Sequence, residues 1–183
     1  MKVGPTIADD IKSSSLLASL LSLLGIFIYL AIRFRRWEFG VGAIVATAHD
    51  VFMIFTLFSL LKGFLPFSTE IDQALIAAVL TIIGYSVNDT VIVFDRVREF
   101  LNLYPTKSLT ENVNGALNTT LSRTTMTSFT TLLVVIVLFI FGGEAIRGFS
   151  FALLVGIVVG TYSSIFIASP IVVDLLARNT KKK

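Results

Sequence analysis

The 183-residue chain contains no cysteine and one histidine, and only 15% of its residues are charged. Without cysteine, disulfides and thiolate metal sites are excluded, and a single histidine argues against a zinc centre. Charged residues make up roughly 25% of an ordinary soluble domain. A chain this poor in charge cannot cover itself with a fully solvated surface.

Charges are also missing from three long stretches, residues 16–32, 124–143 and 148–173. Hydrophobic residues make up 55% of the chain, and the mean hydropathy is +0.86. A surface that faces lipid, unlike one that faces water, can be built from this distribution. The composition therefore indicates an integral membrane protein.

A transmembrane helix needs about 20 predominantly apolar residues. Five stretches of the sequence meet or approach this length: Leu16–Ile32, Val41–Leu61, Ile71–Phe94, Thr124–Phe141 and Gly148–Leu175. The sequence predicts an all-α, polytopic membrane bundle of five transmembrane helices, which forms one transmembrane domain over residues 1–183.

The basic residues indicate how the bundle is oriented. Eleven of the 15 lie in the segment after the first stretch, the segment between the third and fourth, and the C-terminal tail. The positive-inside rule places these segments, and the C-terminus, in the cytoplasm. The N-terminus then lies on the outer side. Because the first apolar run ends in arginines and not in a cleavage site, we expect a further helix upstream.

A short amphipathic helix is predicted on the cytoplasmic face before the fourth stretch. Ser108 and Glu111 have the spacing of a capping box, and apolar residues follow at helical spacing from Val113 to Leu121. The alternative is a polar loop whose apolar residues have this spacing by chance.

Asp89 is an ionisable residue inside a predicted transmembrane stretch, where burying a charge costs free energy. It precedes Asp95 by six residues, which at about 1.5 Å per residue is about 9 Å into the membrane. A carboxyl group away from water can bind and release a proton near neutral pH. Its neighbour Asn88 and Tyr85, one turn away, are weaker candidates for the same relay. Alternatively, Asp89 is a structural carboxylate bonded to a neighbouring helix.

Arg123 lies where the fourth stretch enters the membrane. A guanidinium beside Asp89 would stabilise the ionised carboxylate, and protonation of Asp89 would release the pair. An arginine at this position is also a common snorkelling anchor, so both interpretations stay open.

His49 and Asp50 lie about 15 Å into the second stretch, near the midplane. They are further, weaker candidates for a proton relay, because His49 could carry a proton and Asp50 could accept one. Adjacent helical residues point about 100° apart, so the two should not face the same neighbour. The alternative is a hydrogen-bonded contact between helices.

Small residues in the last stretch indicate close helix packing. Gly156 and Gly160 form a G-x-x-x-G motif, a pattern that lets two helices approach closely. The hydroxyl run from Thr124 to Thr131 either lines a wet path or bonds to helix backbone.

Six segments, in order along nearly the whole chain, resemble the SecF family of protein-export membrane subunits, or the SecF half of a fused SecDF, within the RND superfamily. The run 84–96, with the pattern G-Y-S-x-N-D-T-x-x-x-F-D-R, is the most specific. The other segments are residues 3–5, 48–51, 121–124, 141–149 and 160–164.

This resemblance implies more than the composition does. Members have six transmembrane helices with a periplasmic domain after the first, so the chain would supply the second to sixth. They pair with SecD and assist the SecYEG channel in the bacterial inner membrane, where the proton-motive force completes preprotein export. The family's intramembrane carboxylate and arginine fall on Asp89 and Arg123, whereas the match at His49 and Asp50 carries less weight. The resemblance also implies contact with membrane lipid. It implies no nucleic-acid partner and no cofactor other than the coupling proton.

Two other function classes remain open at this point. A proton-coupled small-molecule exporter of the same superfamily would share the buried charges, and a purely structural membrane module would tolerate their replacement. An enzyme is the least favoured class, because the sequence contains no nucleophile–base set, metal cluster or phosphate-binding loop.

Overall fold

A computed structural model describes residues 5–180 of the chain, and every regular element in this range is helical. The elements are α1 Pro5–Phe34, α2 Trp37–Leu60, α3 Gln73–Leu103, α4 Leu109–Phe141, α5 Glu144–Ser163, the π-helix η1 Ser164–Ala168 and α6 Ser169–Thr180. The prediction of an all-α membrane bundle is confirmed.

Within residues 5–180, four helical segments are long and apolar enough to cross a membrane: α2, α3, α4 and the continuous α5–η1–α6 helix. The first predicted stretch lies in α1, which has 30 residues. The apolar part of α1 found among the described residues, Leu20–Phe34, is shorter than these four.

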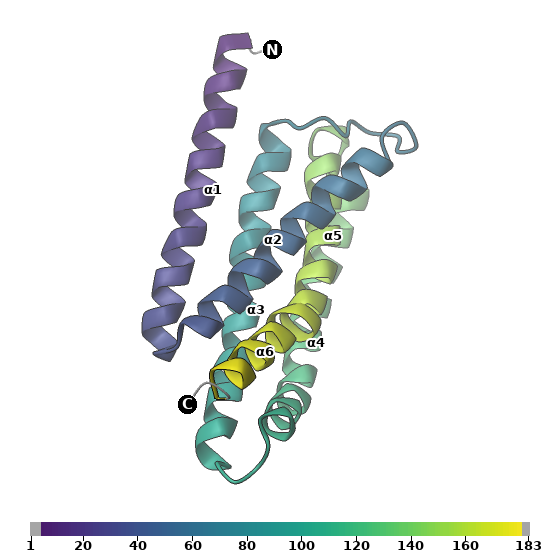
Figure 1. Ribbon diagram of the computed structural model, residues 1–183. Coiled ribbons are helices and arrows are strands. Elements are labelled where there is room, and N and C mark those ends of the chain that lie inside the picture. Colours follow the sequence, from purple (N-terminus) through teal and green to yellow (C-terminus); the bar gives the residue numbers. More distant parts are fainter. Residues whose placement is uncertain (1–4, 181–183) are drawn as a thin grey trace.

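Successive helices run in opposite directions, so the connections gather at two ends of the bundle (Figure 1). The α1–α2 turn, the α3–α4 loop and the end of α6 lie at one end, here called the basic end, which carries Arg33, Arg35, Arg98, Lys107 and Arg178 among others. The 61–72 loop and the α4–α5 turn lie at the far end. This arrangement agrees with the alternation of sides predicted from the loop charges.

The predicted amphipathic helix and the fourth predicted stretch form one helix, α4, with 33 residues. Ser108 caps its start: the Glu111 N–H donates to the Ser108 hydroxyl over 3.2 Å, and the Ser108 N–H donates to Glu111 Oε2 over 2.9 Å. Because the backbone N–H groups of Ser108 and Glu111 both have acceptors, the helix begins directly after Ser108. It continues into the predicted transmembrane stretch without a break. Helix α3 likewise extends nine residues past the predicted Phe94 end, to Leu103.

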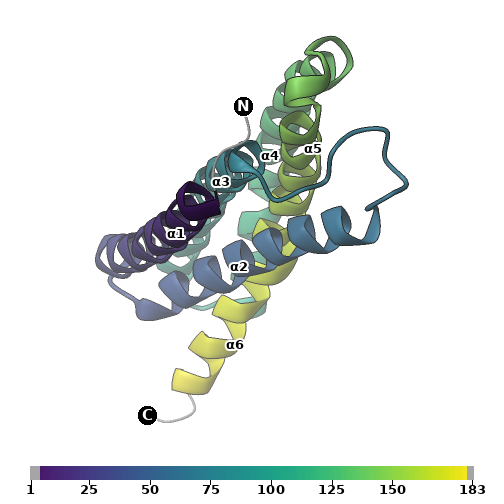
Figure 2. The same cartoon turned by 90° about the horizontal axis from the view of Figure 1, so that it is seen from above.

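The last predicted stretch is interrupted by the π-helix η1, after which α6 runs in a different direction from α5 (Figure 2). Pro170 is the second residue after η1 and has no N–H to donate to a carbonyl of the preceding turn. The Ser169 hydroxyl donates instead to the Ser164 carbonyl over 3.1 Å. The bulge therefore has an identifiable cause in the Ser-Pro step.

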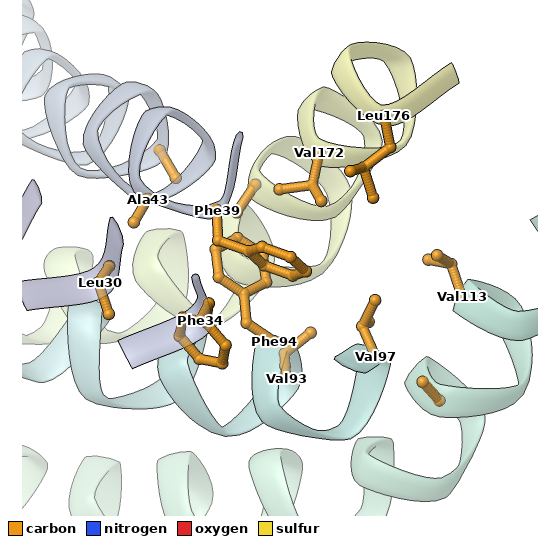
Figure 3. Packing of buried hydrophobic residues seen from close by; sticks show 13 residues of the cluster. Leu30, Phe34, Phe39, Ala43, Val93, Phe94, Val97, Val113, Val172 and Leu176 are labelled. Atoms are coloured by element: carbon orange, nitrogen blue, oxygen red, sulfur yellow. The ribbon is translucent and has the colours of Figure 1, made fainter. Parts of the chain in front are cut away.

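Two apolar clusters stabilise the bundle, one towards each end. In the cluster at the basic end, the ring centroid of Phe39 lies 5.0 Å from that of Phe34 and 5.1 Å from that of Phe94. The three rings are drawn in Figure 3. Val172 and Leu176 bring α6 into the same cluster. The far-end cluster is built from α2, α3, α4 and α5 and consists of Ile54, Phe58, Leu75, Ala78, Val79, Ile82, Ile83, Val135, Ala152, Leu153 and Ile157.

Candidate functional site

A layer of buried polar side chains separates the two apolar clusters. Along each of α2, α3, α4 and the α5–η1 helix, polar residues occupy the positions between the residues of one cluster and those of the other. The members are Thr47, Asp50, Ser86, Asp89, Thr90, Thr120, Thr124, Ser128, Ser163 and Ser164. Because burying a polar group without a partner costs free energy, this layer is the part of the bundle whose chemistry needs an explanation.

Asp50 lies at the centre of this layer and is 1% exposed. Its Oδ2 atom accepts hydrogen bonds from the Ser86 hydroxyl over 2.5 Å and from the Ser163 hydroxyl over 2.9 Å. Its Oδ1 atom lies 3.2 Å from His49 Nδ1. One carboxylate thus joins α2, α3 and α5. The expectation that His49 and Asp50 face different neighbours is only partly met, because Asp50 bonds to two other helices while the His49 ring bends back to it.

Asp89 lies one turn along α3 from Ser86 and is 7% exposed. Thr124 from α4 lies beside its carboxyl group. Asp89 Oδ2 and Thr124 Oγ1 are nevertheless both buried without a hydrogen-bond partner in the described part of the chain. In contrast to Asp50, Asp89 therefore keeps a carboxylate oxygen free to take a proton.

Arg123 does not form an ion pair with Asp89 among residues 5–180. The arginine lies on the exposed side of α4, next to the buried Thr124, because adjacent helical residues point about 100° apart. It remains close enough for its charge to act on the Asp89 carboxyl. In this conformation the two groups are neighbours without direct contact.

Tyr85 links α3 to the hydroxyl run of α4. Its hydroxyl lies 3.4 Å from Ser128 Oγ and 3.5 Å from Thr131 Oγ1. Ser128 in turn lies 2.6 Å from the Thr161 hydroxyl on α5. The run thus bonds across helices at Ser128 and back to its own helix backbone at Thr131, whose hydroxyl also donates to the carbonyl of residue 127. Asn88, the other weak candidate, is exposed.

The glycines of the G-x-x-x-G motif lie against α3. A Cβ atom at Gly156 would lie 2.3 Å from Ile82 Cδ1, and one at Gly160 would lie 3.2 Å from Ser86 Cβ. Gly160 therefore leaves room for the hydroxyl that donates to Asp50.

Sequence reasoning assigned no bonding role to the hydroxyls that complete the layer, Ser86, Thr90, Ser163 and Ser164. Thr90 Oγ1 lies 2.9 Å from Ser164 Oγ, so this second pair also joins α3 to the last helix. A usable signal was the spacing of Ser86 and Thr90, four residues apart on one helical face. The described residues contain no group of three or more acidic or histidine side chains that could hold a metal ion.

Comparison with known proteins agrees with this architecture. Residues 1–178 match the family model described as "Protein export membrane protein SecD/SecF, C-terminal". The chain is 61% identical over 181 residues to the protein translocase subunit SecF of Rhodothermus marinus, covering 99% of this chain and 58% of the relative. It is 47% identical to SecDF of Brucella abortus, covering 94% of this chain and 22% of that protein. The chain thus spans little more than half the length of the SecF relative.

Two solved structures have the same fold. A crystal structure of SecDF in the super-membrane-facing form has a TM-score of 0.86 and 43% identity, over 98% of this chain and 23% of that one. A crystal structure of SecDF from Thermus thermophilus, described as a translocon-associated membrane protein, has a TM-score of 0.84 and 45% identity, over 96% of this chain and 23% of that one. The chain belongs to the SecD/SecF C-terminal family of protein-export membrane proteins.

Proposed function

We propose that this chain is the membrane part of a SecF-type translocase subunit, in which proton binding at Asp89 changes the packing of the bundle and so assists protein export. Relatives named as protein translocase subunits, which match almost the whole chain, support this function. These names do not favour the alternative of a small-molecule exporter.

The observation that carries the proposal is the pair of buried, unpartnered atoms, Asp89 Oδ2 and Thr124 Oγ1. A carboxylate oxygen without a donor in an apolar bundle is poorly stabilised. A proton removes its charge and lets the carboxyl donate a hydrogen bond. Because Asp89 is on α3 and Thr124 is on α4, this exchange changes how the two helices hold each other.

The charge of Arg123 supplies the second part of the switch. While Asp89 is ionised, the guanidinium attracts it from the exposed side of α4. Once Asp89 is neutral, that attraction ends. The Arg123 side chain can then move towards the protein surface that it faces. We propose that this surface belongs to a SecD half of the complex, with SecYEG and the translocating preprotein as further partners.

The available driving force is modest. Moving one charge through 100 mV gives about 2.3 kcal/mol, which biases a two-state bundle by about fifty-fold. One proton therefore shifts the bundle between two states without forcing it fully. In the proposed orientation the basic end and the C-terminus lie on the cytoplasmic side of the bacterial inner membrane. Protons then reach Asp89 from the far end of the bundle.

The test is Asp89→Asn in the full-length protein within its complex. Asparagine keeps the size of the side chain but cannot take up the proton, so proton-dependent export should be lost while the complex still assembles. Asp95→Asn is the matched control, because Asp95 is on the same helix but exposed, in an ion pair with Arg33. Normal proton-dependent export by Asp89→Asn would overturn the proposal.

A further inference from the structure

We infer that Asp50 is a positioning residue: it holds the segment of α3 that bears Asp89 against α5 and η1, and it is not a second proton carrier. This inference rests on the proposed function, because it concerns what keeps Asp89 in place.

Both carboxylate oxygens of Asp50 have polar neighbours within hydrogen-bond distance. Oδ2 accepts from Ser86 and Ser163 over 2.5 and 2.9 Å, and Oδ1 lies 3.2 Å from His49 Nδ1. Hydrogen bonds from hydroxyls to an ionised carboxylate are charge-assisted, and the bond from Ser86 also has the short length of the strong class. A proton on Oδ2 would have to displace one of the two donors, whereas Asp89 Oδ2 has none to displace.

The bonds to Asp50 fix the orientation of α3. Ser86 and Thr90 are four residues apart and lie on one side of the helix. Ser86 is bound through Asp50 to Ser163, and Thr90 lies 2.9 Å from the Ser164 hydroxyl. Two successive residues of the last helix thus hold two successive turns of α3. Because Asp89 lies between these turns on a different face, a rotation of α3 that moved it from Thr124 would break both contacts.

The same contacts connect α3 to the π-helix. Ser163 is the last residue of α5, and Ser164, the first residue of η1, accepts at its carbonyl from the Ser169 hydroxyl. Gly160 permits the close approach of α3, because a Cβ atom there would lie 3.2 Å from Ser86 Cβ and 3.3 Å from Ser86 Oγ. The Asp89 segment, the end of α5 and η1 should therefore move as one unit when the protonation of Asp89 changes.

The inference is tested with Asp50→Asn and Asp50→Ala in the full-length complex, by export rate, its pH profile and thermal unfolding. An amide oxygen has two lone pairs and can accept from both serines. We therefore expect Asp50→Asn to keep the wild-type pH profile and a rate within about twofold. Asp50→Ala removes the acceptor of the Ser86 hydroxyl and leaves the Ser163 hydroxyl only the Gly160 carbonyl of its own helix, 3.1 Å away. It should therefore lose about tenfold in rate, with a displaced pH profile.

Ser163→Ala keeps the inference testable if Asp50→Ala does not accumulate. It removes one donor and should lower the rate and displace the pH profile. The matched control is Ser150→Ala, at an equally buried serine of α5 whose hydroxyl donates to the carbonyl of Ile146 in its own helix. That control should leave both readouts unchanged.

Two outcomes overturn the inference. One is an assembled Asp50→Asn complex as inactive as Asp89→Asn, which would make Asp50 a proton carrier. The other is wild-type rate and pH profile in Ser163→Ala. Asp89→Asn, measured in parallel, separates the two proposals: its continued export would overturn the proposed function, whatever the Asp50 variants do.

Discussion

Gly156 offers the sharpest test of how α3 and α5 pack. A methyl group at this position would lie 2.3, 2.5 and 2.8 Å from three side-chain carbons of Ile82. Contacts this short cannot persist, so one helix has to shift. Ile82 is 1% exposed and, as a β-branched residue, has little rotamer freedom in a helix.

The magnitude follows from a comparison with Gly84. Gly84 lies on α3 and has nothing within 4 Å of the Cβ position. Gly156→Ala and Gly84→Ala gain the same helix propensity, so the difference between them reports the clash alone. Overpacking of this kind costs about 1–3 kcal/mol, which is about 5- to 150-fold in the ratio of folded to unfolded protein.

The assay is denaturant-induced unfolding of the purified protein in detergent. Ile82→Ala is made both in the wild-type protein and in Gly156→Ala. Ile82→Ala alone leaves a cavity and costs about 2–5 kcal/mol, but in Gly156→Ala it also relieves the clash. The double variant should therefore be more stable than the sum of the single changes predicts. Equal stability of Gly156→Ala and Gly84→Ala, or an additive cycle, would refute the packing described here.

Three further substitutions test other parts of the bundle. Ser108→Ala removes the capping box with Glu111 and should cost about 1 kcal/mol, seen as faster hydrogen exchange in the first turn of α4; unchanged exchange would contradict it. Phe94→Ala removes a fully buried ring and should cost about 3–5 kcal/mol in the same unfolding assay, and a loss below 1 kcal/mol would show that the cluster is loosely packed. Tyr85→Phe should cost less than about 1 kcal/mol, because the bond to Ser128 is long at 3.4 Å; a larger loss would assign it a structural role.

Much of the fold could be predicted because its causes are local. Runs without charge define the membrane segments, and the S-x-x-E spacing at Ser108 and Glu111 marks a helix start that the structure contains. The depth of Asp89 is predicted by counting residues back to the first charges at the basic end. None of these inferences needs knowledge of which helices touch.

The rest depends on contacts between distant residues. The sequence gives no indication that Ser163 reaches Asp50, 113 residues away. It places Arg123 near Asp89 in depth, but the side of α4 that Arg123 occupies depends on how α4 packs. The uninterrupted helix from Leu109 and the π-helix before Pro170 are likewise set by packing and by individual hydrogen bonds.

The central claim, that Asp89 exchanges a proton inside the bundle, is tested most directly by infrared difference spectroscopy of the full-length protein in lipid as the pH is varied. A protonated carboxyl group gives a carbonyl band separate from the amide bands. We predict such a band, dependent on pH in wild-type protein and in Asp50→Asn, and absent from Asp89→Asn. An unchanged band in Asp89→Asn, or none in the wild type across the physiological range, would contradict the account.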